Sequence, residues 1–346
     1  MVDVLERRPD RFDLTLARLD PPPYQPGKIG AGLAEIWQEI ERLDLVRHVA
    51  ELDAFGYTII PPERAAPAGF AERLLAAVLD CAEERWGVRL DPARDFPTTG
   101  PADAPDPQDW ANMLNRPTLY ADFPAIPRAY EEALMNPVLL ALVTYMLGYQ
   151  CRLSSGFGAW IKGMNPNETF PLHFDGSRMS PPPAHAECCN TMYLLTDHSK
   201  EDGATCFVPG SHKLLKQPAA GEGMGDRVAA TAKAGSLVVW HGNTWHGAFP
   251  KITHGLRISM PLFFCRPHLK SFTDFQNVPE EMLERNLPRF TTLLGQDLWW
   301  RNYRMLERAG MRKSKDATNL EKSAEEKMAA SEVVVQAMRS TSYFGA

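Results

Sequence analysis

The N-terminal part of the chain has the spacing of apolar side chains that is typical of amphipathic helices. Between residues 31 and 54 an apolar side chain recurs every three or four positions. These side chains are Leu33, Ile36, Ile40, Leu43, Val46 and Val49. The same period predicts helices over residues 70–86 and 129–147, and the apolar run at residues 55–60 predicts a short strand.

After Gly148 the pattern changes to short apolar runs separated by glycine, proline and Asp-Gly pairs. Runs of this length, bounded by turn residues, are typical of antiparallel strands. The runs are CRLSSGFGAWIKG, CCNTMYLLTD, ATCFVPG, GSLVVWHG and RISMPLFFC. They predict a mostly β core, a β-sandwich or jelly roll, with N-terminal and C-terminal helices packed on it.

The pattern also predicts three segments along the chain. Prolines within residues 1–29 predict an extended N-terminal arm. Residues 30–275 would form the β domain together with its helical N-terminal layer. Residues 276–346 would form a helical C-terminal extension that ends in a charged, alanine-rich tail.

Composition and charge argue against several classes of protein. Of the 346 residues, 44% are hydrophobic and 23% are charged, which is ordinary for a soluble globular protein. The net charge of -6 argues against binding to nucleic acid or to an anionic membrane surface. The charged first residues lack the apolar core of a signal peptide, and no segment approaches the roughly 20 apolar residues of a membrane span. Six cysteines without a CxxC pair do not predict a disulfide framework, so we expect a cytoplasmic enzyme.

A candidate metal site begins at the sequence His173-Phe174-Asp175. In a strand, residues two apart share a face, so His173 and Asp175 can both point at one centre. The segment GSLVVWHGNTWHGAF, interpreted as one strand, offers either His241 or His246 as a third ligand. Two histidines and one carboxylate leave three positions of Fe(II) open for a cosubstrate and O₂, whereas zinc normally takes fewer added ligands.

An arginine adds a second feature to this candidate site. Arg257 lies eleven residues after His246, in the strand-like run RISMPLFF. A guanidinium buried beside a metal is explained best by a carboxylate, which its planar fork binds through two hydrogen bonds. This arginine therefore indicates a ligand that carries a carboxylate.

Four motifs in this order resemble the phytanoyl-CoA dioxygenase family. They are HFD, DGATCFVPGSHK, AGSLVVWHGNTWHG and the arginine eleven residues later, and the resemblance covers about residues 151–267. It implies an Fe(II)- and 2-oxoglutarate-dependent oxygenase on a double-stranded β-helix. It also implies that His173, Asp175 and His246 are the iron ligands.

The same resemblance implies a cosubstrate site. Arg257 would hold the distal carboxylate of 2-oxoglutarate, with Ser259 on the same strand face as a helper. Asn190 and Met192 fall where the family has inward-facing residues near the cosubstrate. The spacing to Arg257 also favours His246 over His241 as the third iron ligand.

The segment of residues 176–186 follows two of the expected ligands directly. It would be either a connecting loop or one wall of the substrate mouth. Met179 in this segment and Trp245 beside His246 are candidates for contact with the substrate.

The other histidines and the central cysteines have simpler interpretations. His212 is expected to be structural, whereas His185 and His198 are expected to be solvated in loops. Cys188, Cys189 and Cys206 are expected to be small core residues of strands.

The main hypothesis is a dioxygenase that hydroxylates, desaturates or cyclises an unactivated C–H position of a small organic substrate. Its cofactors would be Fe(II), 2-oxoglutarate and O₂, its co-products succinate and CO₂, and neither nucleic acid nor membrane would be a partner. The alternatives are a zinc hydrolase with the same three ligands and a non-catalytic binding protein of the same fold. Arg257 argues against the hydrolase, because hydrolysis gives this residue no role, and the intact triad argues against the binding protein.

Overall fold

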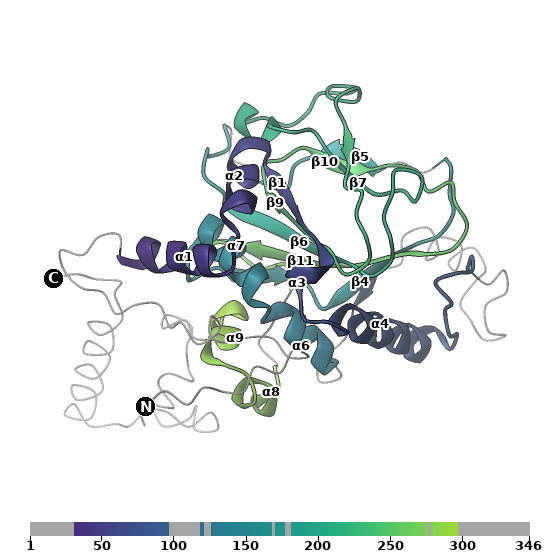
Figure 1. The fold of residues 1–346 in the computed structure, drawn as a ribbon, viewed down its shortest axis with the longest axis horizontal. Helices are drawn as coiled ribbons and strands as arrows, with labels where there is room; N and C mark the ends of the chain where they lie inside the picture. The colour runs from purple at the N-terminus through teal and green to yellow at the C-terminus, as the bar shows by residue number, and fades with distance from the viewer. Residues whose placement is uncertain are drawn as a thin grey trace, which may run out of the picture.

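The computed structural model describes most of the chain between residues 31 and 296. The described residues are 31–96, 118–120, 126–167, 170–176, 181–273, 275 and 278–296. Helices lie at both ends of this part of the chain and strands lie in its middle (Figure 1). The helices are α1 (Ala31–Arg42), α2 (Val46–Phe55), α3 (Pro62–Ala65), α4 (Phe70–Trp86), α6 (Arg128–Leu134), α7 (Pro137–Leu147), the 3-10 helix η2 (Ser211–Leu214), α8 (Glu280–Glu284) and α9 (Pro288–Leu293). The arm expected at residues 1–29 lies outside the described residues.

The strands form two antiparallel sheets. The strands are β1 (Tyr57–Ile60), β2 (Thr118–Tyr120), β3 (Arg152–Ser155), β4 (Gly158–Lys162), β5 (Phe170–His173), β6 (Cys188–Leu194), β7 (Thr205–Phe207), β8 (Val228–Ala229), β9 (Leu237–His241), β10 (His246–Ala248) and β11 (Arg257–Cys265). The major sheet has the order β1-β9-β6-β11-β4-β2, with β3 paired to β11, and the minor sheet has the order β5-β10-β7-β8. Two packed antiparallel sheets with helices on one side confirm the predicted jelly-roll fold class.

The major sheet is buried on both faces. Along β6, Met192 and Leu194 face the minor sheet and pack with Phe207 of β7. Tyr193, between them, faces the other way and packs among the helices. Burial of both faces explains why the run CCNTMYLL does not alternate between apolar and polar residues.

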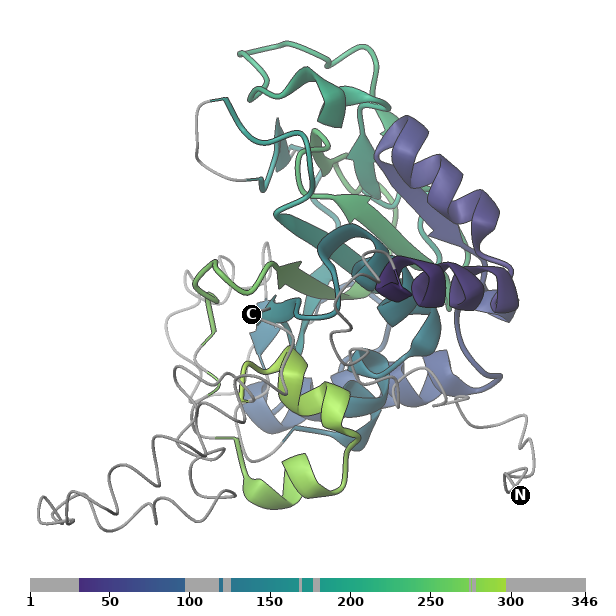
Figure 2. The same cartoon turned by 90° about the vertical axis from the view of Figure 1, so that its left-hand side faces the viewer.

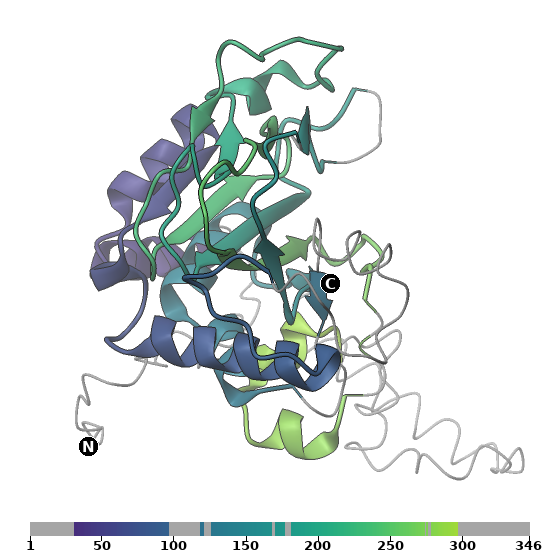
Figure 3. The same cartoon turned by 90° about the vertical axis from the view of Figure 1, so that its right-hand side faces the viewer.

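The helices cover the outer face of the major sheet. Helix α7 lies against β6 and β9, and α2 lies against β1 and β9. Figure 2 shows the purple helices α1 and α2 along one flank of the strands, and Figure 3 shows α4 running beneath them. Helix α9 contacts β3, and its residues Phe290 and Leu293 join the same core, so the start of the C-terminal extension packs on the β domain. Residues 297–346 lie outside the described part of the chain, and within that part no helix has the length and apolarity of a membrane span.

Two of the predicted helices are interrupted, so the prediction of continuous helices is wrong at these points. The helix expected over residues 31–54 divides at Asp44, which has a φ of 54° and an ion pair with Arg64 at 2.6 Å. The helix expected over residues 129–147 divides before Pro137, because proline lacks the N–H that a continuous helix needs. The third predicted helix matches α4 from end to end.

Asn136 links the helical layer to the major sheet at the second of these breaks. Its side-chain oxygen accepts a hydrogen bond from the N–H of Val138 at 2.9 Å and so caps α7. Its Nδ2 donates to the carbonyl oxygen of Ala65 at 2.7 Å and to the hydroxyl of Tyr193 at 2.9 Å. Because Asn136 is fully buried, water does not replace these partners when the side chain is removed.

Asn136→Ala should lower the free energy of unfolding by about 2–4 kcal/mol, because it removes a helix cap and leaves the buried carbonyl of Ala65 without its donor. Tyr193→Phe is the matched control, since it removes one hydroxyl and keeps the cap, and we expect a loss of about 1 kcal/mol. Chemical denaturation followed by circular dichroism measures both changes. Equal losses for the two variants would show that the cap does not stabilise this junction.

Candidate metal centre

The pairing of β5 with β10 brings two of the expected ligands together. His246, the first residue of β10, is the Cα partner of His173, the last residue of β5. Side chains of directly opposed residues project from the same face of an antiparallel pair, and these two rings have centroids 4.2 Å apart. Asp175 follows two residues after His173, and its N–H donates to the carbonyl oxygen of Gly242 at 2.9 Å.

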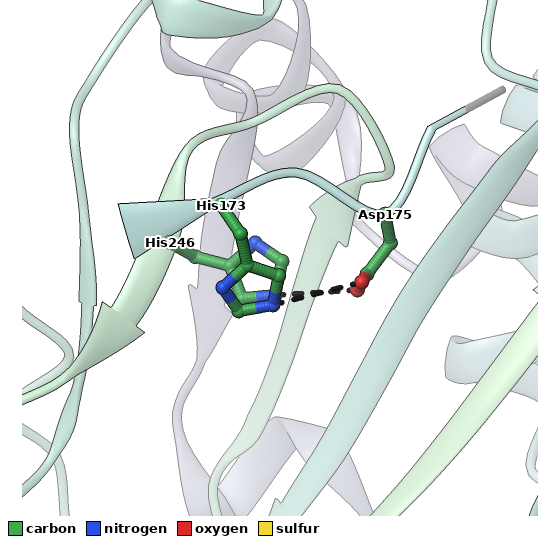
Figure 4. A group of neighbouring side chains, drawn as sticks. All are labelled: His173, Asp175 and His246. Carbon is green, nitrogen blue, oxygen red and sulfur yellow. Dashed lines mark ion pairs between the residues drawn. The ribbon is translucent and has the colours of Figure 1, made fainter. Parts of the chain in front are cut away.

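The donor atoms of the three side chains converge on one point (Figure 4). One carboxylate oxygen of Asp175 lies 3.6 Å from Nε2 of His173, and the other lies 3.2 Å from Nε2 of His246. One donor atom from each residue lies within 4.8 Å of the others, and no second group of this kind occurs among the described residues. The spacing suits three side chains that share one ion.

Both histidines are oriented by the backbone of their own strand. Nδ1 of His173 bonds to the carbonyl oxygen of Pro171, and Nδ1 of His246 bonds to that of Thr244, each at 2.9 Å. A carbonyl oxygen can only accept, so each Nδ1 carries the proton and each Nε2 keeps the lone pair that binds a metal. Hydrogen bonds of this kind fix the ring orientation of histidine ligands.

The third donor, Asp175, is supported from the major sheet. Nδ2 of Asn190 on β6 donates to its Oδ2 at 2.8 Å. Burial alone would raise the pKa of Asp175, but the contact with His246, the nearby histidine charges and the Asn190 amide bring this pKa below its ordinary value. Burial lowers the pKa of His173, and the neighbouring His246 lowers it further. A charged carboxylate and a neutral imidazole are the forms that bind a metal.

The alternative third ligand, His241, lies in the other sheet. The segment interpreted as one strand is in fact two, because His241 ends β9 of the major sheet and His246 begins β10 of the minor sheet. At the turn between them, a Cβ on Gly242 would lie only 2.3 Å from Sγ of Cys188. Nδ1 of His241 accepts the N–H of Asn243 at 3.0 Å, and burial lowers the pKa of His241 to about 4. This histidine is not part of the converging group.

Arg257 and Ser259 face the interior between the two sheets. Ser259 is the Cα partner of Leu194, and Arg257 lies two residues earlier on the same strand face. Leu194 belongs to the interior cluster between the two sheets, which consists of Met192, Leu194, Phe207, Ala230, Val238 and Trp240. Nη1 of Arg257 donates to the carbonyl oxygen of Gly203. The hydroxyl of Ser259 is fully buried and has no hydrogen-bond partner among the described residues. Buried hydroxyl groups are almost always paired, so this one indicates a place for a polar ligand.

Two lysines add positive charge near Arg257. Lys162 is its Cα partner on β4, and its Nζ donates to the carbonyl oxygen of Phe249 at 2.9 Å. Lys251 is 2% exposed, and the carboxylate of Asp202 lies 3.5 Å from its Nζ. Positive groups gathered around Arg257 attract an anion, so the donor set and its surroundings suit a carboxylate.

The comparisons with known proteins agree with this geometry. A family model of phytanoyl-CoA dioxygenase matches residues 63–259, which is more than half of the chain. The chain belongs to the phytanoyl-CoA dioxygenase family. Its relatives include "Dioxygenase af480" of Aspergillus fumigatus, 31% identical over 175 residues, and "Dioxygenase cdmD" of Talaromyces verruculosus, 28% identical over 107 residues. These matches cover 49% and 31% of this chain, and they span 56% and 35% of the two relatives.

Two solved structures are similar to part of this chain. HygX from Streptomyces hygroscopicus, solved with nickel and 2-oxoglutarate bound, is 17% identical with a TM-score of 0.48, covering 65% of this chain and 88% of HygX. The non-heme alpha ketoglutarate dependent epimerase SnoN from nogalamycin biosynthesis is 19% identical with a TM-score of 0.44, covering 65% of this chain and 83% of SnoN.

The cofactors expected from the sequence, Fe(II), 2-oxoglutarate and O₂, are those of the phytanoyl-CoA dioxygenase family. The donor set of His173, Asp175 and His246 fits Fe(II), because two imidazole nitrogens and one carboxylate are typical of non-haem iron oxygenases. The unpaired hydroxyl of Ser259 fits the carboxylate of the cosubstrate. The roles of the individual residues stay predictions.

The remaining candidates lie in different surroundings. Met192 is fully buried in the interior cluster, on the same face of β6 as Asn190. Trp245 is 1% exposed, and its indole N–H donates to the carbonyl oxygen of Lys216 at 2.7 Å, so its contact with the substrate stays a prediction. Met179 lies outside the described residues.

Two residues near the site were not anticipated from the sequence. Trp240 is the Cα partner of Asn190, and its ring centroid lies 5.3 Å from that of His246. Side chains two apart in a strand share a face, so an inward-facing Val238 predicts that Trp240 also faces the interior. The prediction that His198 is solvated is wrong, because its side chain is buried where the chain leaves β6.

His246→Ala should abolish metal retention, whereas His241→Ala should keep it, because only His246 projects toward Asp175. Loss of a residue that merely orients a ligand already weakens metal binding by about 10- to 100-fold, so loss of a ligand should cost more. His241 is the matched control, because it ends β9 just before the turn and His246 begins β10 just after it. Anaerobic equilibrium dialysis with Fe(II) measures retention, and the opposite ranking of the two variants would move the metal site to His241.

Proposed function

We propose that this protein is an Fe(II)- and 2-oxoglutarate-dependent dioxygenase that oxidises an unactivated C–H bond of a small organic substrate. The supporting observation is one jelly-roll interior that contains both the donor set of His173, Asp175 and His246 and the buried guanidinium of Arg257. When bound, iron with 2-oxoglutarate and O₂ supplies the oxidising chemistry, and succinate and CO₂ are the co-products. The product would be hydroxylated, desaturated or cyclised.

The residues of the chain divide the remaining tasks. His173 and His246 would bind the metal through Nε2, since their Nδ1 atoms are engaged with the backbone. Asn190 would hold the carboxylate of Asp175 in place through its hydrogen bond. Arg257 would bind the distal carboxylate of 2-oxoglutarate through its planar fork, with Ser259 as a second donor. A zinc hydrolase would leave this buried arginine without a role, and a binding protein would not need the complete donor set.

Aromatic side chains beside the metal centre support an organic substrate with an apolar body. Phe263 is the Cα partner of Asn190, so it lies on the same face of the major sheet. Phe272 stacks on Phe263 with ring centroids 5.6 Å apart, and Phe272 is 80% exposed. An exposed aromatic stack next to the site favours contact with apolar parts of a ligand.

Arg257→Ala should raise the KM for 2-oxoglutarate by about 30-fold or more, because a desolvated charge-assisted pair is worth about 2–5 kcal/mol. Retention of Fe(II) should be unchanged, because Arg257 is not one of the converging donors. Succinate formation at varied 2-oxoglutarate concentration, with the uncoupled reaction if no substrate is at hand, gives the KM.

Arg47→Ala is the control, since Arg47 is 85% exposed and pairs with Glu51 on α2. This variant should keep the KM of the unaltered protein. An unchanged KM in Arg257→Ala would mean that another residue holds the cosubstrate. Absence of any succinate from the unaltered protein with Fe(II), 2-oxoglutarate and O₂ would contradict the proposed activity itself.

A further inference from the structure

His198 is a buried polar side chain that the tasks above leave unused. It lies beyond the end of β6, and its backbone N–H and C=O pair with Ala232 at 2.9 Å and 3.0 Å. Ala232 packs against the interior cluster between the sheets, and the side chain of His198 is 2% exposed. The pairing therefore holds an imidazole at the interior of the jelly roll.

The segment that carries His198 runs along the first residues of β11. The N–H of Leu195 donates to the carbonyl oxygen of Ile258 at 2.9 Å, and the N–H of Ile258 donates to Oγ1 of Thr196 at 2.9 Å. The imidazole itself lies near the backbone of Ile258, and the positive charge of Arg257 lowers the pKa of the ring. His198 thus lies beside the guanidinium to which the distal carboxylate of the cosubstrate is assigned.

The polar atoms of the ring lack good partners. Neither ring nitrogen of His198 makes a hydrogen bond of good geometry to a described residue. The ring lies near the backbone of Ile258, but its geometry there falls short of a hydrogen bond. The hydroxyl of Ser259, two residues from Arg257 on the same face, is unpaired as well. Since buried polar atoms are nearly always paired, these groups together indicate an acceptor that a ligand brings.

The ring of His198 is neutral when it meets that ligand. Burial lowers its pKa well below the ordinary value of histidine, and the positive charges of Arg257 and Lys251 lower the pKa further, against the opposing effect of Asp202. A neutral imidazole has one N–H donor. It can therefore add a hydrogen bond to an anion without adding another positive charge to this cationic region.

We propose that His198 is a positioning residue for the cosubstrate, whose ring N–H donates to the distal carboxylate of 2-oxoglutarate beside Arg257 and Ser259. The proposal rests on the proposed function, because it assigns a further residue to the same cosubstrate site. Its consequence is selectivity: His198 should contribute to the binding of a 2-oxo acid only when that acid has a distal carboxylate.

The first test compares two acids and two variants by anaerobic titration calorimetry on the Fe(II)-loaded protein. 2-Oxopentanoate has the chain length of 2-oxoglutarate with a methyl group in place of the distal carboxylate. His198→Met, which has no donor, should weaken 2-oxoglutarate by about 10- to 100-fold, the range for a hydrogen bond to a charged group, and should leave 2-oxopentanoate within about twofold. His198→Gln, which keeps an N–H donor, should recover most of the affinity for 2-oxoglutarate.

A second test uses the protein without any substitution in its core. In zinc-substituted protein labelled with ¹⁵N-histidine, 2-oxoglutarate should shift the ring N–H signal of His198, and 2-oxopentanoate should leave this signal where it was. His48 is the internal control, because its ring bonds to the hydroxyl of Thr58 on the outer, helix-covered face of the major sheet, and its signal should respond to neither acid.

The outcomes separate this proposal from the proposed function. Normal binding of 2-oxoglutarate by His198→Met, or an equal loss for both acids, would overturn the role of His198. If Arg257→Ala still lost 2-oxoglutarate in the same assay, the proposed function would stand. Failure of the unaltered protein to bind 2-oxoglutarate at all would instead contradict the proposed function.

Discussion

Everything at the metal centre depends on the register in which β5 pairs with β10. Because His246 lies opposite His173, two imidazoles from distant parts of the chain project from one face of the minor sheet. Each ring is then held by the carbonyl oxygen two residues before it, at Pro171 or Thr244. A slip of one residue in this pairing would turn one of the rings to the opposite face and destroy the site.

The same interior must also accommodate charge, which is expensive to bury. Arg257, Lys162 and Lys251 are buried, and Asp202 lies 3.5 Å from Nζ of Lys251. Removing charged groups from water costs several kcal/mol for each ion unless partners replace the lost hydration. A fold that needed only stability would place apolar residues here. The proposed anionic cosubstrate would account for cations retained at this place and for the unpaired hydroxyl of Ser259.

Local patterns in the sequence predicted much of this arrangement. The apolar runs after Gly148 and the helical period of α4 depend on neighbours in the chain, and the structure contains the corresponding elements. The two-residue spacing of His173 and Asp175 predicted that both would point at one centre, and they do, although β5 ends at His173 and Asp175 lies beyond the strand. The order of the motifs was also sufficient to indicate the family to which the chain belongs.

Other features depend on contacts between distant residues, which periodicity does not encode. The apolar pattern continues through the turn at Gly242, so the sequence did not show that His241 and His246 belong to different sheets. The burial of His198 results from pairing with Ala232, although its own segment is polar and resembles a loop. The Asn-Pro pair at residues 136–137 is a signal for the start of a helix. The prediction gave more weight to the apolar period, which continues on both sides of this pair, and so missed the break.

The central claim is that the three donors and the anion site bind Fe(II) and 2-oxoglutarate together in one interior. The most direct measurement is the visible absorption spectrum of the anaerobic protein with Fe(II), recorded before and after 2-oxoglutarate is added. A weak visible charge-transfer band should develop with 2-oxoglutarate and should not develop with succinate, which lacks the 2-oxo group. A spectrum that stays unchanged with Fe(II) bound and 2-oxoglutarate in excess would contradict the account.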